Sequence, residues 1–252
     1  MVCLGPATRL ASFVQQLPKT YVGEFRLGVT SASDDVETDL EEVQAASIVD
    51  SEQLSSVLPE FLGEIAQIPP AFSAIKLQGQ RAYQLARQGV ELDIEPRNVF
   101  IHSLELVEFD YPNFKLKIEC GSGTYIRSLG RDLGKRLNSG AVMTSLVRTA
   151  VGQFRIDDSV DPGDLTDTGL RDSVVPPAVL FDDSSRVRLN STQIDALKNG
   201  HVFSTDELAL ESRPEFVPAF DADENLVAIM YPHKAGSFKP RLNFVHYYHS
   251  DC

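Results

Sequence analysis

The 252-residue sequence has no apolar run long enough to cross a bilayer, and its first residues lack the basic start and apolar stretch of a secretion signal. It has only three cysteines, Cys3, Cys120 and Cys252, without paired spacing or close metal-type spacing. The sequence therefore predicts a cytoplasmic protein with no membrane partner and no metal.

Basic residues are outnumbered, and the net charge is -13. The charges are segregated, however. Ser31 to Glu64 contains ten acids and no Lys or Arg, whereas Lys115 to Arg148 contains seven basic residues and two acids, a local charge of +5. Because nucleic-acid binding is favoured by clustered positive charge, this pattern is compatible with an RNA groove on an acidic body.

The most informative segment runs from residue 114 to residue 137. Apolar and charged residues alternate from Phe114 to Cys120, which predicts a strand. A glycine turn follows at Gly121 to Thr124, and from Ile126 the apolar residues take helical spacing. Free N–H groups at such a helix start can bind a phosphate or carboxylate. Ordinary turn chemistry and a solvated basic face explain the pattern equally well, and the turn has neither a Walker ending nor a dinucleotide fingerprint.

A capping box at Asp50 and Gln53 predicts a helix, which Pro59 should break. Local patterns also predict a strand over residues 20–30, an extended segment over 68–76, a short helix over 81–89 and a loop or strand over 91–97. Residues 157–184 are rich in turn formers. Beyond them, short strands over 186–189, 215–220, 226–231 and 241–245, a helix over 191–199 with a serine cap and a hairpin turn over 221–225 indicate a small β-barrel or sandwich.

Several short motifs occur in an order that resembles the TruB family of bacterial tRNA pseudouridine synthases. They are Cys3–Arg9, Lys19–Tyr21, Gly28–Thr30 with Asp35, Ile68–Lys76, Gly79, Tyr83, Ala86–Gly89 and Gly123–Arg127. The resemblance covers residues 1 to about 155. It implies an α+β fold, with a mixed, largely antiparallel sheet in a catalytic domain of the pseudouridine synthase type at residues 1–177. A small PUA-like RNA-binding domain is expected at residues 178–252.

The resemblance also implies the reaction. Such enzymes flip the uridine at position 55 out of the T-loop of tRNA and isomerise it through an aspartate nucleophile, without a cofactor or metal. Tyr21 is expected to pack on the base and remove its proton, and Arg127 to pair with the nucleophile. Tyr125 and Leu146 are expected to line the pocket. Lys76 belongs to the segment that resembles the loop closing over the T-arm, and Arg131 and Lys135 of the basic helix are expected to contact RNA. The protein is expected to be monomeric.

The family's Leu-Asp-Pro motif, which carries the nucleophile, does not occur before Cys3. Asp161-Pro162 follows Val160 in a turn-rich segment far downstream, and helical geometry points Asp132 away from Arg127. We therefore expect these 252 residues to be inactive or impaired without an upstream segment. The alternatives are a catalytically silent tRNA-binding protein or tRNA chaperone, and a phosphate-substrate enzyme that uses the Gly121 to Thr124 turn. From spacing alone, Tyr21 is equally well a core tyrosine and Arg127 a surface ion-pair partner.

Overall fold

The computed structural model describes residues 1–77, 79–90, 92–234 and 236–248. The chain forms two compact units. Gln15–Ser159 make up the sheet unit, and Met1–Val14 together with Val160–Cys252 make up the C-terminal unit. Among the described residues, no helix has the length and apolar character needed to span a membrane.

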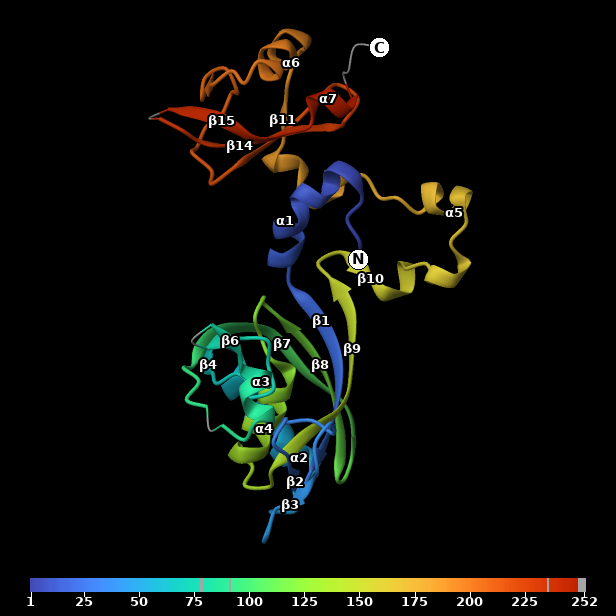
Figure 1. Ribbon diagram of the computed structural model, residues 1–252, viewed down its shortest axis with the longest axis vertical. Helices are drawn as coiled ribbons and strands as arrows, with labels where there is room; N and C mark the ends of the chain where they lie inside the picture. The colour runs from blue at the N-terminus through green and yellow to red at the C-terminus, as the bar shows by residue number, and fades with distance from the viewer. Residues whose placement is uncertain (78, 91, 235, 249–252) are drawn as a thin grey trace. The chain divides into compact units, whose positions relative to one another are not determined.

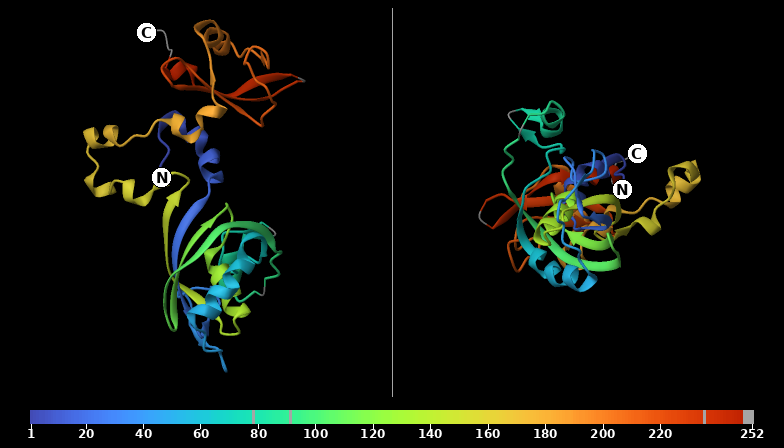
Figure 2. Two further views of the ribbon diagram at one scale, coloured as in Figure 1. Left: turned by 180° about the vertical axis from the view of Figure 1, so that it is seen from behind. Right: turned by 90° about the horizontal axis from the view of Figure 1, so that it is seen from below.

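The sheet unit is built on a six-stranded antiparallel sheet in the order β10-β9-β1-β8-β7-β4 (Figure 1). Its strands are β1 (Lys19–Leu27), β4 (Gly63–Gln67), β7 (Arg97–Asp110), β8 (Asn113–Cys120), β9 (Ala141–Val151) and β10 (Phe154–Arg155). Figure 2 shows the same sheet from behind and from below. Because β1 lies between β8 and β9, each of its central residues has a partner on both sides.

The core of this unit lies between the sheet and α4 (Ile126–Arg136). Phe25 and Leu116, from neighbouring strands, and Leu129 and Leu133 of the helix are completely buried. The alternating strand over 114–120 and the helix after the glycine turn are thus confirmed, and removal of their apolar faces from water holds the two elements together. This packing fixes the start of α4 against the sheet.

Local signals explain the remaining elements of the sheet unit. The capping box at Asp50 is confirmed, since its side chain accepts the Gln53 N–H and Gln53 bonds back to the Asp50 N–H. The helix α2 (Ser51–Val57) ends before Pro59, as predicted, and the 3-10 helix η2 (Leu58–Phe61) follows. The other elements are β2 (Val29–Thr30), β3 (Glu41–Glu42), β5 (Lys76–Leu77), β6 (Gln80–Arg81), α3 (Ala82–Arg87) and η3 (Ile156–Asp158).

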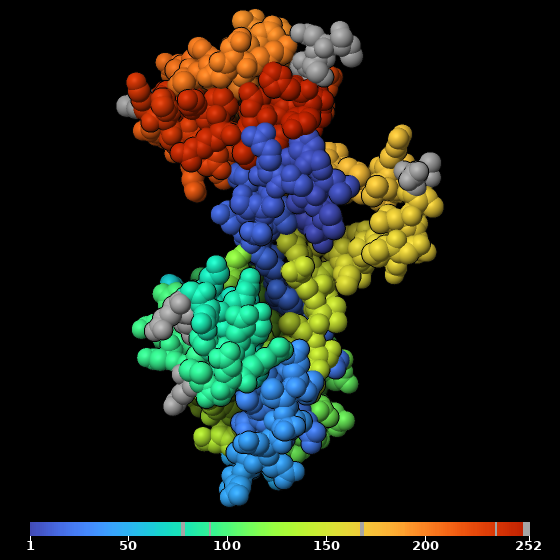
Figure 3. All heavy atoms as spheres, in the orientation of Figure 1, coloured from blue at the N-terminus to red at the C-terminus, as the bar shows by residue number. Residues whose placement is uncertain are grey.

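The predicted extended segment over 68–76 contains no helix, but residues 71–74 form bends and Lys76 already begins β5. Residues 68–75 lead into the β5-β6 hairpin and α3, which confirms the predicted short helix. Figure 3 shows atoms from this part of the chain on the visible surface of the sheet unit. Of the predicted loop or strand over 91–97, residues 92–96 are irregular, Arg97 begins β7, and Glu91 lies outside the described residues.

The C-terminal unit contains one five-stranded sheet in the order β11-β13-β14-β15-β12, rather than the predicted barrel or sandwich. Its strands are β11 (Val187–Arg188), β12 (Phe203–Ser204), β13 (Val217–Phe220), β14 (Leu226–Pro232) and β15 (Ser237–Asn243). The helices that follow residue 160 in this unit are α5 (Asp167–Asp172), α6 (Ser191–Lys198), α7 (Val245–Tyr248), η4 (Pro162–Asp164), η5 (Pro177–Leu180) and η6 (Asp183–Ser185). The predicted hairpin turn joins β13 and β14, where the Asp221 N–H donates to the Asn225 carbonyl.

Two predicted boundaries in this unit were wrong. The cap of α6 is Asn190 and not the serine that follows it, because the Asn190 side chain accepts the Gln193 N–H and Gln193 reciprocates. The last strand ends at Asn243, and Val245 already begins α7.

The first fourteen residues belong to the C-terminal unit, and Leu10 and Phe13 pack in its core. These fourteen residues include η1 (Gly5–Leu10) and the start of α1 (Ala11–Gln16). Leu10 is 1% exposed, and the Phe13 ring lies 5.0 Å from that of Phe216 and 5.5 Å from that of Phe181. Packing therefore places the boundaries between the two units after residue 14 and after residue 159. The functional division into residues 1–177 and 178–252 stays a prediction.

Candidate active site

The candidate site begins with side chains on one face of the central sheet. Tyr21 of β1 pairs with Ile118 of β8 and Arg148 of β9, and Gly23 pairs with Leu116 and Leu146. Because directly opposed residues project to the same side, Tyr21, Leu146 and Arg148 share the face on which α4 packs. Tyr21 is half-buried against the core, whereas Leu146 is 38% exposed. The sheet face that α4 covers is therefore exposed to solvent where it reaches β9.

Gly23 lies where the Phe25 ring and the start of α4 come close to β1. A Cβ atom at position 23 would lie 3.0 Å from the Phe25 ring and 3.5 Å from Cγ2 of Ile126. Ile126 is the first residue of α4 and stands between Tyr125 and Arg127 in the sequence. Gly23 thus leaves room for the Phe25 ring, and the start of α4 lies in ordinary contact distance of the strand that carries Tyr21.

The start of α4 is held by Gln67 from the end of β4. The Tyr125 N–H donates to Oε1 of Gln67 over 2.8 Å, and Nε2 of Gln67 donates to the Tyr125 carbonyl over 3.1 Å. Gln67 is 1% exposed. A buried amide that satisfies both backbone groups of one residue fixes that residue strongly. The sequence analysis did not predict these two hydrogen bonds to Tyr125, because in the sequence Gln67 is only a polar residue before Ile68-Pro69.

Arg127 is held by the chain on three sides. Its Nη1 lies 2.8 Å from Oδ2 of Asp35 and 3.4 Å from the Ser33 carbonyl, and its Nη2 donates to the Phe72 carbonyl over 3.0 Å. The side chain of Asp35 is 9% exposed. Its Oδ1 accepts the Ser33 hydroxyl over 2.5 Å and the Glu37 N–H over 2.9 Å. Both oxygens of Asp35 are therefore engaged.

The expected pairing of Arg127 with the nucleophile stays a prediction, and the aspartate that pairs with Arg127 inside these 252 residues is Asp35. It belongs to one of the motifs that carry the family resemblance, so the sequence contained a signal for it. The two residues are 92 positions apart, however. No local pattern predicts their pairing, which depends on the backbone bridge between Asp35 and Met143 of β9.

Arg131 lies one turn further along α4 and makes an equivalent set of internal bonds. It contacts Asp34 and Asp132, each over 2.9 Å, and donates to the Ile68 carbonyl over 2.8 Å. Its side chain is 17% exposed. The guanidinium thus joins three parts of the protein, and the expected contact of Arg131 with RNA stays a prediction. Lys135, by contrast, is exposed on the same helix, and Lys76 is exposed on β5.

The glycine turn is largely occupied by the protein itself. The Gly121 N–H donates to the Phe100 carbonyl over 2.8 Å, and the Thr124 hydroxyl donates to the Gly121 carbonyl over 3.1 Å. With the Tyr125 N–H bonded to Gln67, fewer donors remain for a phosphate than the sequence suggests. Lys19 donates to the Ser122 hydroxyl over 2.6 Å and to the Gln15 carbonyl, and burial lowers the pKa of Lys19. The hypothesis of a phosphate-substrate enzyme loses its main support.

The phenol of Tyr21 has a perturbed ionisation. Burial raises its pKa, and the nearby thiol of Cys120 adds to this effect. The Arg148 guanidinium lowers the pKa of Tyr21 through its charge and as a hydrogen-bonding partner. Arg148 was not singled out from the sequence, although it alternates with Leu146 on the same strand. It is the cation that acts on the Tyr21 ring from β9.

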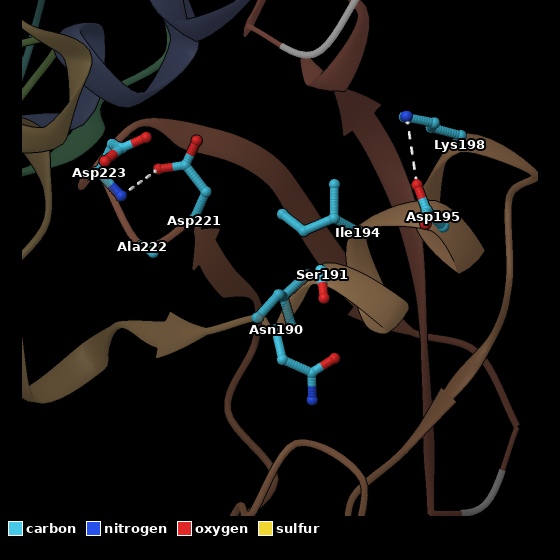
Figure 4. Close-up of a pocket in the computed structure, with 9 residues that line it drawn as sticks. Asn190, Ser191, Ile194, Asp195, Lys198, Asp221, Ala222 and Asp223 are labelled. Atoms are coloured by element: carbon cyan, nitrogen blue, oxygen red, sulfur yellow. Dashed lines mark hydrogen bonds and ion pairs between the residues drawn. The ribbon is translucent and has the colours of Figure 1, made fainter.

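A separate pocket of about 230 Å³ lies in the C-terminal unit (Figure 4). Its polar lining includes Asp195, Lys198, Asp221 and Asp223, and Asp195 pairs with Lys198 over 3.2 Å. Three carboxylates and one ammonium disfavour a phosphate ligand. The pocket contains none of the residues predicted for the site. Among the described residues, no group of three or more His, Cys, Asp or Glu is arranged to hold a metal ion.

Comparison with known proteins gives consistent matches. The model of the family described as TruB family pseudouridylate synthase (N terminal domain) matches residues 1–126. A "tRNA pseudouridine synthase B" of Dehalococcoides mccartyi is 39% identical over 248 residues, which are 97% of this chain and 82% of that protein. A protein of the same name from Bacteroides fragilis is 42% identical over 162 residues, 64% of this chain and 70% of that protein.

Two solved structures share the fold. A chain in the crystal structure of a Cbf5-Nop10-Gar1 complex superposes with a TM-score of 0.71 at 21% identity, covering 96% of this chain and 70% of that one. A chain in an H/ACA RNP bound to a substrate RNA containing 2'-deoxyuridine gives a TM-score of 0.69 at 19% identity, covering 96% and 70%. The predicted α+β fold of the pseudouridine synthase type is thus confirmed.

Proposed function

This chain belongs to the TruB family of pseudouridylate synthases, and we propose that it isomerises the uridine at position 55 in the T-loop of tRNA to pseudouridine. The observation that supports this most directly is the open sheet face between β1 and β9. There a half-buried tyrosine and an exposed leucine lie on the sheet face on which α4 packs, and α4 carries a firmly held arginine. A pocket for an extruded base needs such apolar walls and a fixed charge.

In the proposed reaction the target uridine leaves the RNA stack and packs on Tyr21. Tyr125 and Leu146 form the walls of the pocket, and the Tyr21 phenol exchanges the proton that the base must lose. Arg127 supplies a positive charge that costs no reorganisation, because Asp35 and the Phe72 carbonyl already fix its guanidinium. No cofactor takes part.

The proposal does not use Asp35 as the attacking carboxylate. The side chain of Asp35 is only 9% exposed, its Oδ1 accepts two hydrogen bonds, and it does not stand in a Leu-Asp-Pro motif, so it has little access to a substrate. Asp34 is likewise bound to Arg131. We therefore place the nucleophile in an upstream segment that contains a Leu-Asp-Pro motif, and we expect the 252-residue chain alone to bind the substrate without converting it.

The test compares the 252-residue chain with a form extended upstream to include that motif. Each is incubated with T-arm RNA, and pseudouridine is quantified in the product. Conversion by the extended form alone is the expected result. A matched RNA with cytidine at position 55 controls for background. Conversion by the 252-residue chain would contradict the placing of the nucleophile, and absence of conversion by both forms would contradict the proposed reaction.

The same experiment separates the enzyme from a silent tRNA-binding protein or chaperone. In the extended enzyme, Tyr21→Phe should abolish conversion while leaving binding of T-arm RNA nearly unchanged, because the ring that stacks on the base remains. A pure binding protein would show normal affinity and no conversion in every form. We further propose that the protein acts as a monomer in the cytoplasm, with the exposed Lys76 and Lys135 contributing to RNA contact.

A further inference from the structure

Arg148 is a charged residue of the open sheet face that the proposed reaction has not yet used. It lies directly opposite Tyr21 in the β1-β9 pair, next to a register shift between Thr20 and Tyr21. Such a bulge changes the direction of neighbouring side chains. Arg127 and Arg131 are fixed by aspartates, whereas no ion pair joins Arg148 to a carboxylate within the described part of the chain. Its guanidinium is thus free to act on the phenol.

The other charged and titratable groups around Tyr21 do not replace it. Cys120 on β8 acts against ionisation of the phenol, and burial raises the pKa of that thiol as well. Lys19, at the start of β1, is committed to Gln15 and Ser122. The Arg127 guanidinium on α4 is already bound to Asp35 and to the Ser33 and Phe72 carbonyls. From β9, only Arg148 is a cation that acts on the phenol in the direction of ionisation.

We propose that Arg148 is a positioning residue that holds the Tyr21 phenol and favours its ionised form during the reaction, an inference that rests on the proposed function. The phenol first releases its proton to solvent. The phenolate then takes the proton from the base carbon that has formed the new glycosidic bond. The electrons of the broken C–H bond return to the base ring, and a new O–H bond forms on Tyr21. The guanidinium stabilises the negative oxygen before the transfer.

The direct test measures the ionisation of position 21 without any substrate. A fluorinated tyrosine is incorporated at position 21, which brings the phenol ionisation down to a pH at which the protein is folded, and a single ¹⁹F resonance is followed against pH. Arg148→Gln removes the charge, Arg148→Lys keeps it, and Arg155→Gln removes an exposed charge from the adjacent β10. Circular dichroism shows that each variant is folded.

We expect Arg148→Gln to move the ¹⁹F transition to higher pH, Arg148→Lys to move it less, and Arg155→Gln to leave it unchanged. In the extended form, Arg148→Gln should lower kcat at neutral pH roughly threefold to tenfold, with KM unchanged and the rate recovering at higher pH. An unmoved transition in folded Arg148→Gln would overturn the inference. If the ¹⁹F transition moves in Arg148→Gln but the unsubstituted extended form makes no pseudouridine, the result contradicts the proposed function and not the role of Arg148.

Discussion

At the scale of single residues, the position of Arg127 depends on Asp35, which is not the proposed nucleophile. Oδ2 of Asp35 contacts Arg127, and the pair is mostly buried. Asp35→Asn keeps the shape but removes the charge, so that Arg127 is left partly unpaired. We expect the free energy of unfolding to fall by about 1–3 kcal/mol, as measured by urea denaturation.

The neighbouring Asp34 gives a matched control, because it holds Arg131 over a similar distance. Asp34→Asn should also lower the free energy of unfolding. Only Asp35→Asn should lower the conversion rate of the extended form by more than about tenfold, since only Arg127 lies in the proposed site. Equal loss of activity in both variants would show that Arg127 has no special role.

At the scale of elements, the position of the site depends on how closely α4 packs on β1. Gly130 faces the Phe25 ring, and a Cβ atom there would come within 2.5 Å of Cδ1. Helix propensity alone predicts that Gly130→Ala stabilises the protein by about 1 kcal/mol. We expect the steric effect to be larger, with a net loss of about 1–3 kcal/mol, because the core cannot accept the added methyl group.

The control for this prediction is Lys135→Ala on the exposed side of the same helix, which should change the free energy of unfolding by less than about 0.5 kcal/mol. Thermal and urea denaturation measure both variants. A stabilised Gly130→Ala protein would show that α4 is not held against Phe25. The same variant should reduce conversion by the extended form, since Tyr125 and Arg127 begin the displaced helix.

The elements that the sequence predicted are those with an unbroken period. The strand over 114–120 and the helix after it keep one periodicity from end to end. In β7 and β9, register shifts such as those between Ile101 and Ser103 and between Leu106 and Glu108 break the alternation, so neither strand was predicted. For the candidate site, the sequence pointed to Tyr21 and Arg127 because both lie in motifs that resemble the family. Gln67 and Arg148 act through partners distant in sequence, which no local pattern encodes.

At the scale of the whole molecule, folding removes much of the local positive charge that the sequence suggested. Of the seven basic residues between Lys115 and Arg148, four form ion pairs, namely Lys115 with Glu24 and Glu108, Arg127 with Asp35, Arg131 with Asp34 and Asp132, and Arg136 with Glu60. The three that remain are Lys117, Lys135 and Arg148. Lys117 pairs with Val22 and so projects to the sheet face opposite Tyr21. With the exposed Lys76 of β5, Lys135 and Arg148 leave about three unpaired cations for the proposed RNA contact, so few counterions are released when RNA binds.

This charge distribution predicts a shallow salt dependence for binding of T-arm RNA. Each phosphate contact contributes a slope of roughly -0.7 to -0.9 in a plot of log K against log salt concentration, so about three contacts give a slope near -2 to -3. Fluorescence anisotropy over a range of KCl concentrations measures it. Lys135→Ala should make the slope less steep by about one contact, while Lys115→Ala, whose ammonium is bound to two glutamates, should not. A slope several times steeper would contradict this prediction, because it would mean that several more phosphates are neutralised by the protein.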